Sequence, residues 1–193
     1  MGRSTLSIVV ALALMLCAGY AAAQTTPGPD TLKVDYFSNA NTSGAPDGSV
    51  KITNPGTEGG ELCAAIFVFD ANEELSECCS CPVSINDLRT LSVDTDLTGN
   101  PLTGNVLNTG SIRVVSTLTV GGTCPLPTPG KVTPAASVRV WATHIQNSGW
   151  TITEQPSPDA TFSSVEFTKL ENYCYAVKLV GSNKGVCTCG TGD

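Results

Sequence analysis

Hydrophobic residues recur at every second position in several short segments, which is the pattern of strands buried on one face. It predicts strands in TLKVDYF, SVKITN, RTLSV, SIRVVSTLTV and ASVRVWATHIQ, with Gly-, Pro-, Asn- and Thr-rich segments between them. In the first of these, Leu32, Val34 and Tyr36 are expected to face the core, because polar residues separate them. Short strands with intervening turns favour a sandwich over alternating β and α units.

The segment LCAAIFVFD, residues 62–70, is apolar at every position before its last. Successive residues of a strand point to opposite faces, so both faces of this strand are apolar. We expect it in the middle of the domain, with one face on an opposing sheet and the other face under a cover.

One helix is predicted near the C-terminus, at about residues 164–180. Ser163 as N-cap and Glu166 three residues later form a capping box, and Gly181 stands where a left-handed C-cap is expected. An apolar stripe on this helix is expected to cover the outer face of the central strand. The stripe comprises Phe167, Leu170, Tyr173, Cys174, Val177 and Val180.

The N-terminus has the pattern of a secretory signal peptide: Arg3, then an apolar run, then small residues before Gln24. Cleavage between Ala23 and Gln24 is predicted, so residues 1–23 are a signal peptide, 24–30 a Pro/Gly linker and 31–193 a single domain. A lipoprotein attached through Cys17 is disfavoured, because the preceding residue is Leu16 rather than a small residue. The protein is therefore predicted to be secreted, extracellular or periplasmic.

The net charge of the chain and the placement of its basic residues exclude some classes of binding partner. The chain has 10 basic and 17 acidic residues, and removal of Arg3 with the signal peptide changes the formal charge from −7 to −8. Nucleic acids and anionic membranes require clustered Lys and Arg, and here the basic residues are scattered singly. No apolar segment after the signal peptide is long enough to span a bilayer. Nucleic-acid binding and membrane insertion are therefore not expected.

Eight cysteines remain after Cys17 is removed, and an even number in an exported chain predicts disulfides. A zinc site is expected to show paired C-x-x-C motifs or histidines at fixed spacing, and the chain has CC, C-x-C and the single His144. Copper binding by the C-x-C thiols remains an alternative. Cys78 and Cys79 are expected to bond different parts of the chain rather than each other. The eight are Cys63, Cys78, Cys79, Cys81, Cys124, Cys174, Cys187 and Cys189, and their pairing stays open.

Few residues suggest a further chemical site. In DTDLTGN, Asp94, Asp96 and Thr98 are placed like the first half of a calcium loop, but Asn105 occupies the twelfth position, where a bidentate Glu is required. A solvated acidic turn is the favoured interpretation. His144 has no nucleophile identifiable in the sequence, so a histidine on the face of a strand is favoured over a catalytic triad.

The strings GGELCAAIFVFDANEELSECCSCPVS, DLTGNPLTG and GVCTCGTG resemble a group of secreted, cysteine-rich proteins from soil bacteria. The resemblance spans most of the mature chain. It implies export and a shared cysteine framework, and it implies no activity.

The predicted fold is mainly β: an antiparallel sandwich, immunoglobulin-like in general architecture, cross-linked by disulfides, with one amphipathic C-terminal helix covering a sheet. The predicted function is a secreted, non-catalytic structural or binding module of the cell envelope or extracellular space. Its partner is a protein or a glycan, and no cofactor is predicted. The alternatives are a copper- or zinc-binding protein using the C-x-C thiols, and a small secreted hydrolase.

Overall fold

A computed structural model describes residues 31–146 and 149–190. The predicted signal peptide, its cleavage site at Ala23 and Gln24, and the linker 24–30 lie outside the described residues. The fold that follows is that of the predicted domain.

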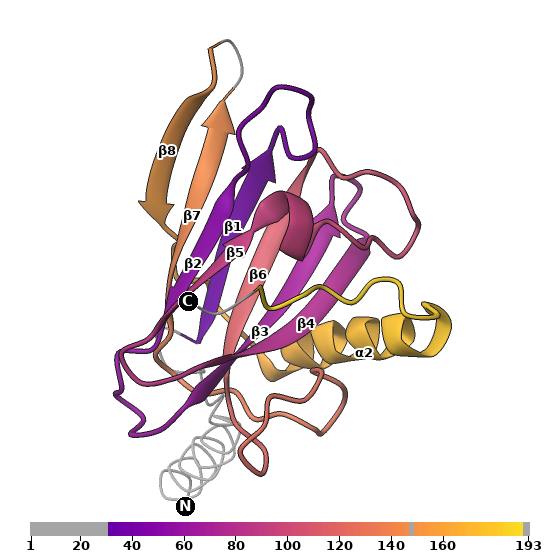
Figure 1. Ribbon diagram of the computed structural model, residues 1–193. Coiled ribbons are helices and arrows are strands. Elements are labelled where there is room, and N and C mark those ends of the chain that lie inside the picture. The colour runs from indigo at the N-terminus through magenta and orange to yellow at the C-terminus, as the bar shows by residue number, and fades with distance from the viewer. Residues whose placement is uncertain (1–30, 147–148, 191–193) are drawn as a thin grey trace, which may run out of the picture.

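Two antiparallel four-stranded sheets form the domain (Figure 1). Sheet A has the strand order β1-β6-β3-β4, and sheet B has the order β5-β2-β7-β8. The strands are β1 (Leu32–Ser38), β2 (Ser49–Thr53), β3 (Leu62–Asp70), β4 (Leu75–Val83), β5 (Leu88–Ser92), β6 (Thr109–Leu118), β7 (Arg139–Gln146) and β8 (Thr151–Pro156). One π-helical turn, η2 (Val93–Leu97), follows β5, and one α-helix, α2 (Ser164–Val180), follows β8.

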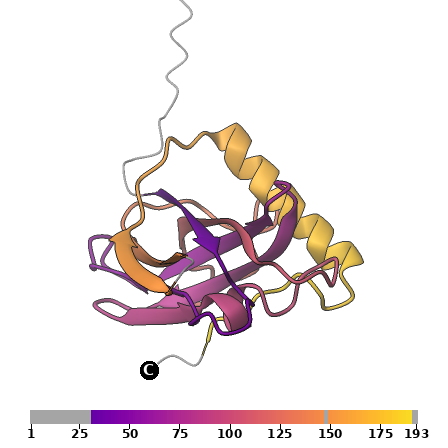
Figure 2. The same ribbon diagram turned by 90° about the horizontal axis from the view of Figure 1, so that it is seen from above.

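Strand β3 has an interior position in sheet A and is buried on both faces, as its continuous apolar run predicts. Leu62, Ile66 and Val68 belong to the core between the two sheets. Ala65 and Phe67 belong to a second core on the outer face of sheet A, together with residues of α2. Figure 2 shows α2 lying along one side of the strands. The predicted cover of the central strand is therefore confirmed.

Helix α2 occupies the predicted range and begins with the predicted cap. Ser163 Oγ accepts a hydrogen bond from the Glu166 N–H at 3.1 Å. The predicted left-handed cap at Gly181 is wrong, because its φ is −72°. The left-handed residues come later and include Gly185 at φ +76°. A Cβ at Gly185 would lie 2.6 Å from Val177 Cγ1, so glycine allows the chain to turn back closely beneath the helix.

All eight cysteines in the described ranges form disulfides, as the sequence predicts. The pairs are Cys63–Cys124, Cys78–Cys174, Cys79–Cys187 and Cys81–Cys189. The neighbours Cys78 and Cys79 bond different segments, because adjacent residues of β4 point to opposite faces of sheet A. One disulfide therefore anchors α2 on the outer face, and two others anchor the C-terminal segment 185–190.

Three details of the strand prediction need correction. The segments of β4 and β8 were not predicted as strands, because cysteines obscure the apolar pattern of β4 and most of β8 is exposed. In β1, Tyr36 is half exposed whereas Lys33 and Phe37 are buried. The simple alternation fails there because β1 is an edge strand that contacts sheet B on one side and the second core on the other.

The mainly β fold class is confirmed: two antiparallel sheets, one C-terminal helix over a sheet, and four disulfides. The immunoglobulin-like arrangement is not confirmed. Pro82 is accommodated in β4 because that strand lies at an edge of sheet A, where fewer ladder hydrogen bonds are required.

Candidate functional site

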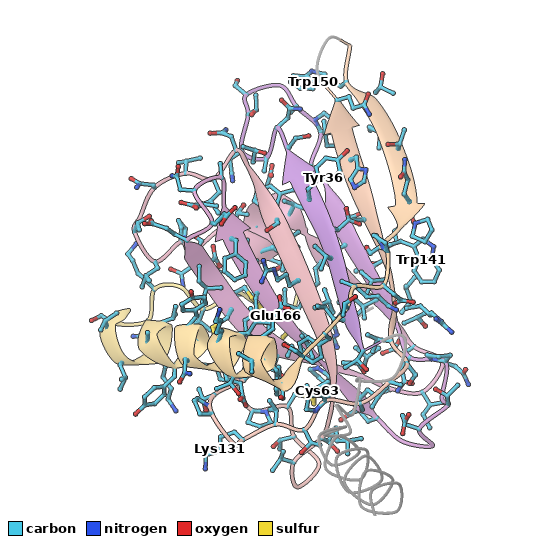
Figure 3. All side chains as sticks on the ribbon, turned by 180° about the vertical axis from the view of Figure 1, so that it is seen from behind. Tyr36, Cys63, Lys131, Trp141, Trp150 and Glu166 are labelled. Carbon is cyan, nitrogen blue, oxygen red and sulfur yellow. A yellow bond between two sulfur atoms is a disulfide. The ribbon has the colours of Figure 1, made fainter. Side chains whose placement is uncertain are left out.

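A groove of about 600 Å³ lies between α2 and the outer face of sheet A. Figure 3 shows this face, with the helix crossing only part of the sheet and Glu166 near the junction. The lining residues come from β3, β6, the β3–β4 turn, and the N-cap and N-terminal part of α2. They are Phe69, Glu73, Ser111, Arg113, Ser163, Val165, Glu166, Lys169, Leu170 and Tyr173.

Arg113 connects the sheet to the helix across this groove. Its guanidinium carbon lies 4.7 Å from the centroid of the Phe69 ring, which is a cation–π contact. One guanidinium nitrogen lies 3.3 Å from Glu166 Oε1. About a third of each charged side chain is exposed, so both retain capacity for further hydrogen bonds.

The local sequence explains these positions. Antiparallel pairing places Ser111 opposite Phe69 and Arg113 opposite Phe67, so all four side chains share the outer face of sheet A. The Ser163 cap starts the helix so that Glu166 falls in its first turn, facing Arg113. The groove therefore lies where the paired strands β3 and β6 adjoin the first turn of α2.

Tyr173 was predicted to be buried in the apolar stripe of α2, and this is wrong. Its side chain is 50% exposed, and Val180 is also exposed. Glu171 is buried instead, and burial raises the pKa of its carboxyl. The Cys78–Cys174 disulfide ties the helix to edge strand β4, which turns the Glu171 side inward and leaves Tyr173 at the groove.

The Tyr173 ring contacts Phe69 edge-on, with centroids 6.4 Å apart. Such T-shaped pairs hold a ring in a defined orientation. The result is a half-exposed aromatic ring, supported from below, beside a guanidinium and a carboxylate. This combination is suited to binding a small polar molecule.

A second cluster lies where the C-terminal segment meets β4. The sulfur atoms of Cys79, Cys81 and Cys189 lie within 4.8 Å of one another, and within the described ranges no other group of three metal-capable side chains is this close. These sulfurs belong to two disulfides and carry no thiolate. In this state the cluster cross-links the chain.

Glu77 precedes Cys79 and Cys81 on β4 and is completely buried. Burial raises the pKa of its carboxyl from 4.5 to about 7, although the Asn100 N–H, which donates to Oε1 at 2.9 Å, opposes the shift. Within the described part of the chain, Oε2 has no hydrogen-bond partner. Glu77 is thus a buried acid that accommodates a proton at neutral pH.

The calcium candidates form part of the local turn structure around η2. Asp96 accepts hydrogen bonds from the Ser92 N–H at 2.8 Å and from Thr188 Oγ1 at 2.6 Å. Asp94 Oδ1 accepts from the Asn41 N–H at 2.9 Å, and burial raises the pKa of this carboxyl. The structure does not gather Asp94, Asp96 and Thr98 around one point, because each makes contacts in a different direction.

The hydroxyl of Thr98, the third calcium candidate, is already engaged in hydrogen bonds inside the protein. Its Oγ1 donates to the Val93 carbonyl at 2.8 Å and accepts from Asn41 Nδ2 at 2.9 Å. These contacts close the π-helical turn. They leave calcium binding by these residues as a prediction without a preformed ligand shell.

His144 lies in a buried polar cluster between β1 and β7. Its Nε2 is 2.6 Å from Asp35 Oδ1, and its ring stacks on Tyr36 with centroids 4.2 Å apart. Ser157 Oγ donates to the other Asp35 oxygen at 2.7 Å. In a catalytic triad the serine hydroxyl bonds to the histidine, whereas here it bonds to the carboxylate. The geometry is that of a structural contact between the sheets.

Sequence reasoning identified the helix cap and the cysteines but missed the groove. Arg113 did offer one signal, since it is a charge within the otherwise apolar strand SIRVVSTL. Tyr173 offered none, because its helical position fits the buried stripe as well as the exposed flank.

No family model matches the chain, and no curated protein or solved structure matches it either. Within the described residues, no helix combines the length and apolarity required to cross a membrane.

Proposed function

We propose that the protein is an exported, non-catalytic binding module of the cell envelope or extracellular space. The observation that carries the proposal is the Cys78–Cys174 disulfide, which clamps α2 to sheet A and leaves a preformed groove beside the contact. Preformed, concave sites of mixed polarity are typical of small-ligand binding. Four disulfides are characteristic of proteins that fold in oxidising compartments, which supports export.

The chemistry of the groove supports binding rather than catalysis. Its described lining contains no histidine and no cysteine. Its two carboxylates are Glu73, in an exposed turn, and Glu166, which pairs with Arg113. A glycosidase requires two carboxyl groups that face the scissile bond, and here one of the two is held in an ion pair with Arg113.

The experiment is an equilibrium-binding survey of the oxidised mature protein against soluble glycans and peptides, with analysis of each ligand after prolonged incubation. We expect saturable binding and intact recovered ligand. The C78A/C174A variant, in which the helix clamp is absent, should bind at least tenfold more weakly than the C63A/C124A control, which lacks a disulfide elsewhere. Cleaved ligand would indicate an enzyme, and binding that does not depend on the clamp would refute the proposed site.

The closeness of Cys79, Cys81 and Cys189 supports a second candidate, a soft-metal binding protein. It requires reduction of two disulfides, because thiolates are the metal ligands. Intact mass before and after reduction, together with metal analysis of the native protein, tests it. Four disulfides correspond to a gain of about eight hydrogens on reduction. A smaller gain accompanied by bound copper or zinc would favour the metal function.

A further inference from the structure

We propose that the groove between α2 and sheet A binds a neutral carbohydrate, with one sugar ring stacked on Tyr173 and its hydroxyls held by Arg113 and Glu166. The inference rests on the proposed binding function and names the ligand class of that same site. Three properties of the groove carry it: its charge balance, its hydrogen-bonding groups and its exposed aromatic ring.

The groove has no net formal charge. Its lining includes two basic residues, Arg113 and Lys169, and two acidic residues, Glu73 and Glu166. A polyanion would be repelled by an acidic chain of formal charge −7, and the balanced lining of the groove gives a polycation no net attraction at this site. A ligand without net charge matches this balance.

The groups beside Tyr173 match adjacent sugar hydroxyls. A guanidinium provides only donors and a carboxylate only acceptors, and both are planar groups that bind in a bidentate manner. Arg113 and Glu166 present the two groups side by side through a single contact of 3.3 Å. A hydroxyl both donates and accepts, so a pair of neighbouring hydroxyls satisfies the two groups together. Simple ions and aliphatic ligands satisfy at most one of them.

The aromatic ring provides the apolar part of the site. Tyr173 is 50% exposed, whereas Phe69 is only 4% exposed beneath Arg113. The open area of Tyr173 is therefore the surface on which the C–H face of a sugar ring packs. The groove, at about 600 Å³, lies within the range of about 300–1,000 Å³ that is usual for small-ligand sites.

Because the site offers a single exposed ring, we expect modest affinity, with a Kd on the order of 0.1–1 mM. NMR titration of the full mature, oxidised protein suits this range. The probes are neutral oligosaccharides of glucose, xylose and N-acetylglucosamine, with oligogalacturonate as the charged comparison and a random peptide library as the protein-like comparison. Amide shifts should concentrate at Ser111, Lys169 and Tyr173.

The two tyrosines chosen for substitution are about half exposed on α2, so that replacing them should leave the fold intact. Tyr173→Ala should weaken binding of a neutral oligosaccharide at least tenfold, and Tyr173→Phe should retain it within about threefold, because the ring is kept. Tyr175→Ala is the matched control: Tyr175 is 44% exposed on the same helix and lies outside the groove. Arg113→Lys, which keeps the charge but loses the planar fork, should weaken binding about fivefold or more.

The outcomes together distinguish a failure of the ligand class from a failure of the proposed function. Neutral saccharides whose binding is lost in Tyr173→Ala and kept in Tyr175→Ala support both. Peptides or oligogalacturonate that bind through Tyr173 while neutral saccharides do not overturn the carbohydrate inference and leave the binding module standing. The same holds if neutral saccharides bind equally well to both variants. If no probe binds the wild-type protein, both proposals fail.

Discussion

The two long sides of the sandwich are closed by different chemistry. On the β4–β5 side, the C-terminal segment lies along β4 and is fixed by Cys79–Cys187 and Cys81–Cys189. On the β1–β7 side, the closure is non-covalent and includes the contacts of Asp35 with His144 and Ser157. The same sandwich is thus held by covalent bonds on one side and by buried polar contacts on the other.

Both arrangements also protect an edge strand. The Cys78 N–H donates to the Gly185 carbonyl at 2.9 Å, so the C-terminal segment covers the free edge of β4. The Val34 N–H donates to the Pro158 carbonyl at 3.3 Å, so the segment after β8 covers β1. Covered edges offer no template for pairing with another chain. An irregular segment can therefore be held over an edge strand by disulfides or by buried polar contacts. Only the arrangement held by disulfides depends on redox conditions.

The largest effect is expected when both disulfides of the β4–β5 side are removed. Cys79–Cys187 and Cys81–Cys189 each span 108 residues and close nearly the same loop. Either one therefore keeps most of the entropic constraint on the unfolded chain. Removing one pair by Cys→Ala substitution should lower the free energy of unfolding by about 1 kcal/mol, and removing both pairs by about 4 kcal/mol. Urea unfolding measures both, and additive effects of the two pairs would contradict the shared-loop argument.

On the β1–β7 side, Asp35→Ala should lower the free energy of unfolding by about 3 kcal/mol, because it leaves His144 and Ser157 buried without their acceptor. Ser157→Ala, which removes only one hydrogen bond, should cost about 1 kcal/mol. Urea unfolding with and without a reductant tests the comparison. The Asp35→Ala loss should be the same under both conditions, and a loss that disappears under reduction would show that the two sides are not independent.

Because Glu77 lies on β4, at the side closed by disulfides, it should make the stability of the protein depend on pH. Its carboxyl pKa is about 7 in the folded protein against an ordinary 4.5, so the folded state binds the proton more tightly. Stability is therefore highest below about pH 4.5 for this group and falls as pH rises to about 7. Glu77→Gln, which keeps the acceptor for Asn100, should stabilise the protein by about 2 kcal/mol at pH 8 and by nothing measurable at pH 4. Unfolding curves at the two pH values decide it, and equal effects at both would be contrary to this assignment.

The smallest effect is expected at an exposed ion pair near the polar side. Lys51 Nζ lies 2.7 Å from Glu154 Oε2, and more than a third of each side chain is exposed. Glu154→Gln should therefore change stability by less than about 0.5 kcal/mol, and 0.5 M salt should remove the difference. Thermal unfolding at low and high salt measures it. If Glu154→Gln lowered the stability as much as Asp35→Ala, burial would not be the reason why the polar contacts of Asp35 are strong.

Much of the fold was predictable because its signals are local. The two-faced apolar run of β3, the Ser163 cap and the even cysteine count each depend on neighbouring residues or on a simple count. Strand β8 was missed because an exposed strand lacks apolar alternation. Strand β4 was missed because three of its buried positions are cysteines and two more are Ser76 and Glu77, so it lacks an apolar alternation. The groove was missed because it exists only between elements.

By itself, the sequence determined that this chain forms short antiparallel strands around a central apolar one, has a capped helix near its C-terminus, and pairs the eight cysteines of the predicted domain. Those properties follow from side-chain period, capping chemistry and the even number of those cysteines. Only the tertiary structure decided which cysteines pair, that Asp35 meets His144, and that Tyr173 lies in a groove with Arg113. These depend on the rotation of a helix and on the approach of strand edges far apart in sequence, for which no local signal exists.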